Sequence, residues 1–381
     1  MDTIYKHDPV LRLLHKKLGL TPSLAYIGHA AIQLGCLSLY CWKMGCLFVH
    51  GHIIGLWEDY GFIINNLLAF SAFWALYIWV PQSIGQVLRS LKQNKVIRGI
   101  SNQRSGHSPA ISDYSSSVTA ALNRLSSWWL IVSSIVLSVL ISVFLFAHDM
   151  RMTHIWYVYK TAPFVFIITA YAVDMTVLLL SVGRIAVFAS ELRKLFRLFD
   201  LDIRPLHPDR GGGLGSIGQF SVRLGGFIAV LGLNGGALLL LQQYSRTGSF
   251  VLVGRYFSFT LGTWLGIIAY LALIPVSFLA FVWTAHSAMK RAKDERLLRI
   301  AEQFELVYGA LQSHISQPES SYCQVDLEGY LDQIEQLQKL YKVTEAFPVW
   351  PFNFQDLVRF VTTTISPLAL TLLPTLLELL I

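Results

Sequence analysis

The stretch WWLIVSSIVLSVLISVFLFA, from Trp128 to Ala147, contains no charged residue. An α-helix rises 1.5 Å per residue, so about 20 residues cross the hydrocarbon core of a bilayer. An uncharged run of this length is typical of a transmembrane helix and is longer than most helices buried in soluble proteins. The stretch therefore predicts a helical protein that spans a membrane.

The composition of the rest of the chain agrees with this prediction. The 381 residues are 54% hydrophobic and 14% charged, whereas a soluble domain carries about 25% charged residues. Six further apolar runs are long enough to span a bilayer: 24–48, 61–82, 161–183, 221–243, 257–284 and 356–381. We therefore expect an all-α, polytopic transmembrane helical bundle of about seven spans, with cytosolic helical extensions.

The distribution of lysine and arginine predicts the orientation of the bundle. If the N-terminus is cytoplasmic, the inside segments hold 25 of the 30 Lys and Arg residues. Basic residues are enriched on the cytoplasmic side of membrane proteins, so we expect the N-terminus inside and the C-terminus outside. The net charge of +7 then reflects these loops and does not by itself indicate nucleic-acid binding. The expected location is the inner (plasma) membrane, with membrane lipid as a partner.

The same patterns divide the chain into five parts. Residues 1–82 form a basic N-terminal segment and two spans, and 83–126 a cytosolic basic helix and loop. Residues 127–284 hold spans three to six, with a cytosolic glycine-rich loop at 204–218. Apolar residues at helical spacing predict a cytosolic helical hairpin within 285–355, which ends in a Pro/aromatic elbow before the last span, 356–381. The hairpin packs either on its own chain or on copies of it.

The glycine-rich loop contains HPDRGGGLGS, residues His207 to Ser216. Consecutive backbone N–H groups in such a turn form a nest for anions, and nearby arginines supply positive charge. The candidate ligand is an anionic nucleotide or oligonucleotide, and the candidate residues are Arg204, His207, Arg210, Gly211, Gly212, Gly213 and Arg223. The alternative is a tight turn in which Asp209 or Ser216 caps the next helix. Nucleotide-binding motifs are absent, and the His-Pro-Asp signature of J-domain co-chaperones lacks its soluble helical bundle.

Polar residues inside the spans are the other candidates, because a charge in hydrocarbon costs several kcal/mol unless it faces protein or water. Asp174 lies near the middle of a span, where it either pairs with Lys43, Arg184 or Arg223 or lines an aqueous path. The last span carries hydroxyls, prolines and a terminal acid, which suit a pore. The candidate ion path consists of Asp174, Asn234, Thr362, Thr363, Thr364 and Glu378.

The sequence offers little for catalysis. It contains no HExxH, no GxSxG and no CxxC among its four cysteines. We therefore predict no enzymatic activity, no cofactor and no metal site.

Two motifs carry a family resemblance, namely HPDRGGGLG before the fifth predicted span and FPVWPFNFQDLVRF (Phe347 to Phe360) before the last. With them the chain resembles uncharacterised multi-pass membrane proteins of bacteria, which implies an inner-membrane location and no particular activity. Its architecture is also similar to that of bacterial anti-phage effectors. Those proteins oligomerise and depolarise the membrane on a nucleotide or nucleic-acid signal.

Three functions follow as expectations. The first is a homo-oligomeric ion channel, a tetramer or larger, that is gated through its basic cytosolic helices. The second is a secondary transporter with Asp174 as its coupling group. The third is a membrane enzyme or scaffold.

Overall fold

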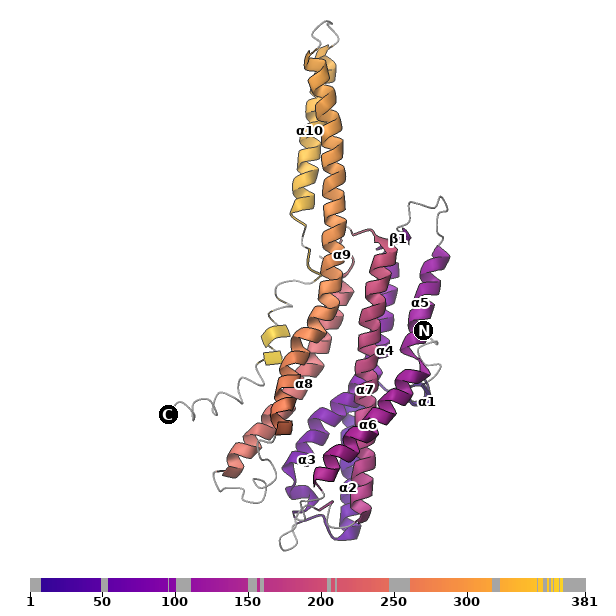
Figure 1. The fold of residues 1–381 in the computed structure, drawn as a ribbon, viewed down its shortest axis with the longest axis vertical. Coiled ribbons are helices and arrows are strands. Elements are labelled where there is room, and N and C mark those ends of the chain that lie inside the picture. Colours follow the sequence, from indigo (N-terminus) through magenta and orange to yellow (C-terminus); the bar gives the residue numbers. More distant parts are fainter. Residues whose placement is uncertain are drawn as a thin grey trace.

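The structure is a computed structural model, and almost all of it is helical (Figure 1). The residues that it describes are 8–48, 54–94, 96–100, 111–149, 156–157, 161–203, 207–209, 211–246, 261–316, 323–347, 349–351, 355, 358, 360–362 and 364–365. Within them, one short antiparallel pair, β1 (Ile97–Ile100) with β2 (Phe199–Leu201), is the exception to the all-helical architecture. It joins the end of α4 (Ser71–Gln93) to the end of α7 (Thr161–Leu198).

Five helical segments of the described chain are long and apolar enough to cross a membrane. They are Pro22–Met44, Tyr60–Gln93, Tyr114–Phe144, Phe164–Leu198 and Gly215–Leu238. Each overlaps one of the apolar runs in the sequence, so the chain has the helices of a polytopic membrane protein.

The remaining two predicted spans lie largely outside the described residues. In the run 257–284, the side chains up to residue 278 are outside them, although the backbone of α9 (Leu261–Ser316) is described. The run 356–381 is described at only a few positions. The count of seven spans and the cytoplasmic N-terminus therefore stay predictions.

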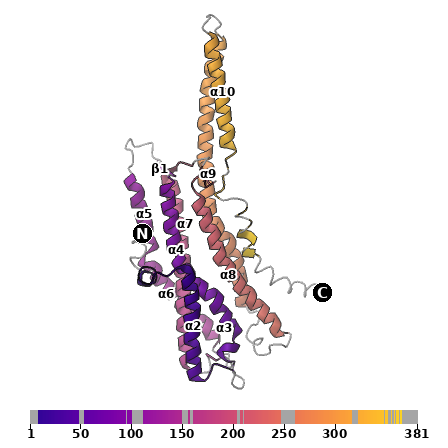
Figure 2. The same ribbon diagram turned by 180° about the vertical axis from the view of Figure 1, so that it is seen from behind.

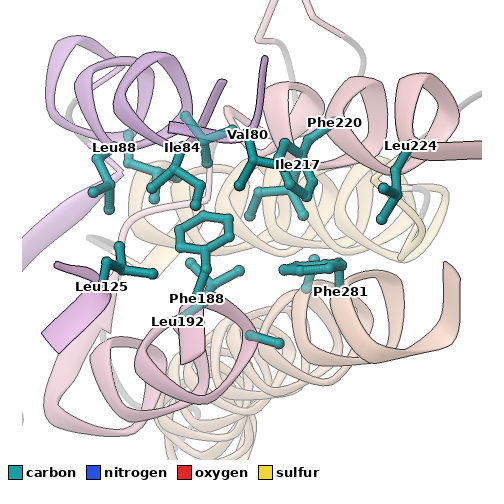
Figure 3. Close-up of a cluster of buried hydrophobic side chains, with 14 of the residues drawn as sticks. Val80, Ile84, Leu88, Leu125, Phe188, Leu192, Ile217, Phe220, Leu224 and Phe281 are labelled. Atoms are coloured by element: carbon teal, nitrogen blue, oxygen red, sulfur yellow. The ribbon is translucent and has the colours of Figure 1, made fainter. Parts of the chain in front are cut away.

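Helix α4 is at the centre of the bundle. It packs against α2 (Pro22–Met44), α7 and α8 (Gly215–Arg246), while α6 (Trp128–Asp149) packs on the far side of α7. Figure 3 shows the apolar cluster in which side chains of α4, α5 (Ile111–Leu125), α7, α8 and α9 meet. At its middle the rings of Phe188, Phe220 and Phe281 lie 5.0–5.6 Å apart, a spacing typical of stabilising aromatic pairs.

Local sequence signals fix the ends of α2. The hydroxyl of Thr21 accepts a hydrogen bond from the Leu24 N–H, and Pro22 follows as the first helical residue. Gly45 ends the helix with a φ of 70°, which a residue with a side chain rarely adopts.

The second candidate span is interrupted in its helical geometry. It begins as α3 (Tyr60–Asn65), which Asp59 caps through the Phe62 N–H after a short 3₁₀ turn at Leu56–Glu58. A π-helical segment, Asn66–Phe70, connects α3 to α4. Such segments occur often at functional sites, because they leave a backbone carbonyl without its regular partner.

The hairpin made by α9 and α10 (Cys323–Glu345) extends well beyond the bundle at one end (Figures 1 and 2). Helix α9 has 56 residues, or about 84 Å, so the same helix enters the bundle and forms the first arm of the hairpin. At the start of the chain, α1 (Pro9–Leu11) and a π-helical turn, Arg12–Lys17, place Asp8 and Leu11 in the interior.

Candidate functional site

Three buried ionisable residues lie on the same candidate membrane-spanning helix, α7. Glu191, near the end of the helix, pairs with Arg124 and Lys194. The other two are more deeply buried: Asp174 has 2% of its surface exposed and Arg184 has 1%. Ten residues separate them, so they are about 15 Å apart along the helix. Burying a charge in a low-dielectric interior requires partners, so the partners of each decide what it can do.

Asp174 is held by side chains from two other helices. Trp74 of α4 donates its Nε1–H to Oδ1 at 2.8 Å, and Gln33 of α2 donates to Oδ2 at 3.4 Å. Nε2 of His29, also on α2, lies 3.2 Å from Oδ1. The rings of His29 and Trp74 are stacked, with centroids 5.7 Å apart. The carboxylate therefore sits where α2, α4 and α7 meet.

The hydrogen bonds around Ser71 establish where His29 carries hydrogen. Ser71 is completely buried, and its hydroxyl donates to the carbonyl oxygen of Asn66 at 2.6 Å. A hydroxyl has one hydrogen, so its oxygen can only accept a bond from His29 Nδ1, which is 3.3 Å away. In this arrangement Nδ1 is therefore protonated.

His29 Nε2 lies 3.2 Å from Asp174 Oδ1, close enough for the two residues to share a proton. With one shared proton, the pair is either imidazolium with carboxylate or imidazole with carboxylic acid. In both forms the pair has zero net charge, which burial favours. We call these two residues the proton pair.

The proton pair is linked to the π-helical segment through Ser71. The Ser71 hydroxyl donates to the carbonyl oxygen of Asn66, which is the first residue of the segment. If His29 loses a proton and keeps hydrogen on Nε2, Nδ1 becomes an acceptor. The Ser71 hydroxyl can then turn from the Asn66 carbonyl to the ring. The Ser71 hydroxyl is therefore the contact that links the pair to this segment.

Arg184 is neutralised from the start of the chain. Asp8 Oδ2 accepts hydrogen bonds from Arg184 Nη2 and from the Tyr77 hydroxyl, both at 2.5 Å. Asp8 Oδ1 accepts from the Leu11 N–H at 3.0 Å and so caps α1. The guanidinium also lies over the Tyr77 ring, 5.2 Å from its centroid. We call Asp8, Tyr77 and Arg184 the arginine cluster.

The proton pair and the arginine cluster are connected through two neighbouring aromatic rings. Trp74, which bonds Asp174, packs edge-on against Tyr77, which bonds Asp8, with ring centroids 6.2 Å apart. A contiguous row of side chains therefore runs from the proton pair to the arginine cluster along α4 and α7.

The pairing predicted for Asp174 is wrong in this structure. Its partners among the described residues are His29, Trp74 and Gln33 rather than Lys43, Arg184 or Arg223. Lys43 lies in the last turn of α2, 14 residues or about 21 Å beyond His29. Arg184 is bound by Asp8, and Arg223 is exposed.

Among the described residues, the other polar side chains predicted for an ion path make their hydrogen bonds away from Asp174. Asn234 of α8 donates to Asn65 of α3 at 2.8 Å and so links these two helices. The hydroxyls of Thr362 and Thr364 donate to carbonyls of their own helix, at Val358 and Phe360. Thr363 and Glu378 lie outside the described residues.

The glycine-rich loop binds a carboxylate of its own chain. Asp209 accepts three backbone hydrogen bonds of 3.0 Å, from the N–H groups of Gly211, Gly213 and Gly215. His207 Nδ1 lies 2.7 Å from Asp209 Oδ1. Two of the three glycine amides predicted to receive an anion, those of Gly211 and Gly213, and the first amide of α8 are thus occupied by Asp209. Arg204 and Arg210 lie outside the described residues.

Asp209 is held in its charged form. Burial raises the pKa of Asp209, but the hydrogen bonds from Gly213, Gly215 and Gly211 and from His207 lower it more. The pKa of this carboxyl therefore lies below its ordinary value.

The glycines of this loop are required by close packing. Gly212 and Gly213 have φ values of 66° and 97°. A side chain on Gly212 would collide with Ile203 and the Phe347 ring, and one on Gly213 with Val96. The loop therefore joins the end of α4, the exit from β2 and the proline-rich elbow.

The two motifs that carry the family resemblance are in contact. Gly212 meets Phe347, and Gly211 lies against the carbonyl of Pro351. Farther along α8, a Cβ on Gly225 would be 2.3 Å from the ring of Phe360. The elbow before the last predicted span is thus seated on the loop and on α8.

Sequence reasoning found Asp174 but missed most of the residues around it. His29 and Gln33 are four residues apart on α2, and Ser71 and Trp74 three apart on α4, so each pair shares a helix face. These spacings were available in the sequence. The sequence comparisons add no further information, since the chain matches no protein-family model, no curated protein and no solved structure.

Proposed function

We propose that this protein is a secondary transporter in which the proton pair, His29 with Asp174, binds and releases the proton that moves with the substrate. The observation that carries the proposal is the contact of His29 with the buried Asp174, in which Nε2 lies 3.2 Å from Oδ1. A titratable pair buried between three candidate membrane-spanning helices is typical of proton relays in pumps and transporters.

The surroundings of the pair favour an exchangeable proton over a permanent ion pair with a third charged residue. From α2, Asp174 faces His29 and Gln33, and from α4 it faces the neutral side chain of Trp74. Helix α6, which packs on α7, has no ionisable residue between Trp128 and Ala147. The next charged group along α7 in the described chain is Arg184, which Asp8 neutralises. No neighbouring charge among these fixes the pair in one protonation state.

The link through Ser71 supplies a route from protonation to movement. When the pair releases its proton, Ser71 turns to the imidazole and the Asn66 carbonyl loses its partner. The π-helical segment can then return to regular helical bonding, which shifts α3 relative to α4 by a fraction of a turn. The change of helix geometry would alter access to the pair.

Proton-coupled uptake into proteoliposomes tests the proposal. Vesicles that contain a pH-sensitive dye receive inward gradients of small carboxylates, amino acids or sugars, with protein-free vesicles as the baseline. We expect one class to acidify the lumen above that baseline, and Asp174→Asn and His29→Gln to abolish the response. The matched control is Thr176→Val, which removes a partly buried hydrogen bond to Ser138 (2.6 Å) two residues from Asp174. If Thr176→Val abolishes uptake as completely, the pair has only a structural role.

A homo-oligomeric channel is the second candidate function. The observation that favours it is the exposed apolar surface of the α9–α10 hairpin, beyond the bundle, where Leu306 is 75% exposed and Leu298 is 61% exposed. Such side chains suit contacts between copies. In the vesicle experiment, a channel gives an ion current that needs no substrate gradient and survives Asp174→Asn.

A further inference from the structure

The arginine cluster has the features of an occupied anion site. Arg184 is almost completely buried, yet only Nη2 of its guanidinium bonds Asp8. Nε and Nη1 have no hydrogen-bond partner among the described residues. A buried donor without a partner is destabilising, so the arginine is poorly satisfied by the carboxylate that it has.

Asp8 divides its two oxygens between two tasks. Oδ1 accepts from the Leu11 N–H to cap α1, and Oδ2 accepts from both Arg184 and Tyr77. A guanidinium binds a carboxylate best through two parallel hydrogen bonds. A carboxylate that is not tied to α1 can use both of its oxygens on Arg184.

Asp8 belongs to a much shorter element than its two partners do. It lies 176 residues from Arg184 in sequence and precedes a helix of three residues, of which Leu11 is buried in the core. After that helix, the segment contacts α4 at His15, whose Nδ1 is 3.0 Å from Gln82 Nε2. Arg184 and Tyr77, by contrast, lie within long helices, α7 and α4. The arginine side of the site is thus built by two long helices, and the carboxylate side by a short helical turn.

We propose that Arg184, with the Tyr77 hydroxyl, is a binding site for a small carboxylate anion, and that Asp8 occupies it from within the chain when that anion is absent. Removing one partner of a buried ion pair leaves a buried charge unpaired, which is strongly destabilising, so Asp8 leaves only when another anion takes its place. The N-terminal segment is then displaced by the ligand. In the predicted orientation, the ligand enters from the cytoplasmic side.

This inference rests on the proposed transport function where it assigns the carboxylate as the substrate that moves with the proton. The binding itself does not depend on transport. The row of contacts through Trp74 and Tyr77 joins the anion site to the proton pair, which is what coupling of the two ligands requires.

Chemical rescue of Asp8→Ala in the full-length protein tests the site. This variant leaves Arg184 without its carboxylate, and acetate has the size and charge to replace it. We expect acetate to raise the melting temperature of the variant in a saturable way, by roughly 2–4 °C, whereas acetamide and chloride at equal ionic strength do not. The double variant Asp8→Ala/Arg184→Leu, which carries neither charge, is expected to give no acetate response.

A rescue by acetate that is no larger than that by chloride or acetamide overturns the site. If Asp8→Ala yields folded protein only when it is purified in acetate, the site is supported. If it folds in none of the three solutions, Asp8→Asn is used, because an amide oxygen still accepts from Leu11 while the charge of Arg184 is left unpaired. Absence of an acetate-specific stabilisation in Asp8→Asn then overturns the site.

The two proposals fail in different ways. Acetate rescue, together with vesicles in which no substrate class acidifies the lumen above the baseline, keeps the anion site and removes transport. Proton-coupled uptake of amino acids or sugars, without acetate rescue, keeps transport and removes the anion site.

Discussion

The molecule contains two aspartates that each face a histidine, and the difference between them separates a fixed charge from a movable one. Asp209 lies in the loop before α8, and Asp174 lies within the bundle. The side chain of Asp209 is 23% exposed and that of Asp174 is 3% exposed. Asp209 is bound mainly by backbone N–H groups, whereas Asp174 is bound only by side chains among the described residues.

Backbone donors cannot give up their hydrogen, so the three amides around Asp209 stabilise one state, the carboxylate. The donors around Asp174 include an imidazole, which can hold its hydrogens in three ways. A carboxylate surrounded by amides therefore serves the architecture, and one beside a buried imidazole can serve chemistry. The substitutions below would break this comparison if the two sites responded alike.

The largest effect is expected from combined substitution of the proton pair. Asp174→Asn alone should lower proton-coupled uptake by about a hundredfold or more, the usual scale for loss of a proton-transferring group. Adding His29→Gln should lower it little further, because the two residues hold one proton together. Initial rates in proteoliposomes measure both. Two separate losses that multiply would show that the residues act independently.

The second-largest effect is expected from Asp209→Ala, which should lower the stability of the protein without changing the coupling of proton to substrate. Asp209→Ala leaves the N–H groups of Gly211, Gly213 and Gly215 without their acceptor, and all three residues are buried. We expect the free energy of unfolding to fall by about 3 kcal/mol, while the proton-to-substrate ratio of the folded fraction is unchanged.

The control for Asp209→Ala is Glu335→Ala on the α9–α10 hairpin. Glu335 is an exposed carboxylate whose pKa is lowered by a bond to Lys339, 2.6 Å away. Its removal should give no resolvable change in stability, since exposed pairs contribute little. A changed proton-to-substrate ratio in Asp209→Ala would contradict the assignment of Asp209 to the architecture.

The pH dependence of stability sharpens the same comparison at a smaller scale. The pKa of Asp209 is lowered in the folded protein, so its stabilising contribution is complete above the unfolded pKa, about 3.9. It is lost as the pH falls through the folded pKa. Thermal melts of the wild type and Asp209→Asn between about pH 3 and pH 7 should therefore differ most near neutrality and converge in acid. A constant difference over this range would contradict the lowered pKa.

The sequence predicted one of these two aspartates more fully than the other. Asp209 acts on amides two to six residues away, so capping by Asp209 was among the local alternatives that the sequence offered. Asp174 was recognisable as a charge in an apolar run, and the length of such runs also predicted the five candidate spans. Its partners on α2 and α4 depend on helix packing, which the pattern of one helix does not encode. The contact between Asp8 and Arg184 joins residues that are even farther apart in the sequence, and nothing in the basic N-terminal segment predicted it.

The smallest effect is expected from Ser71→Ala, and it separates proton binding from movement. In the protonated pair the Ser71 oxygen accepts from His29 Nδ1, and in the deprotonated pair its hydroxyl donates to the same nitrogen. Removing it costs both states a similar hydrogen bond, so the pH at half-maximal uptake should move by less than about 0.5 unit, which is under 1 kcal/mol. Without the hydroxyl, however, protonation of the pair no longer changes the hydrogen bonding of the Asn66 carbonyl. The maximal rate of uptake should therefore fall about threefold to tenfold, or about 1 kcal/mol. A pH profile of uptake at saturating substrate separates the two quantities. A shifted profile with an unchanged maximal rate would show that Ser71 only tunes the affinity of the pair, and that the π-helical segment takes no part in the transport cycle.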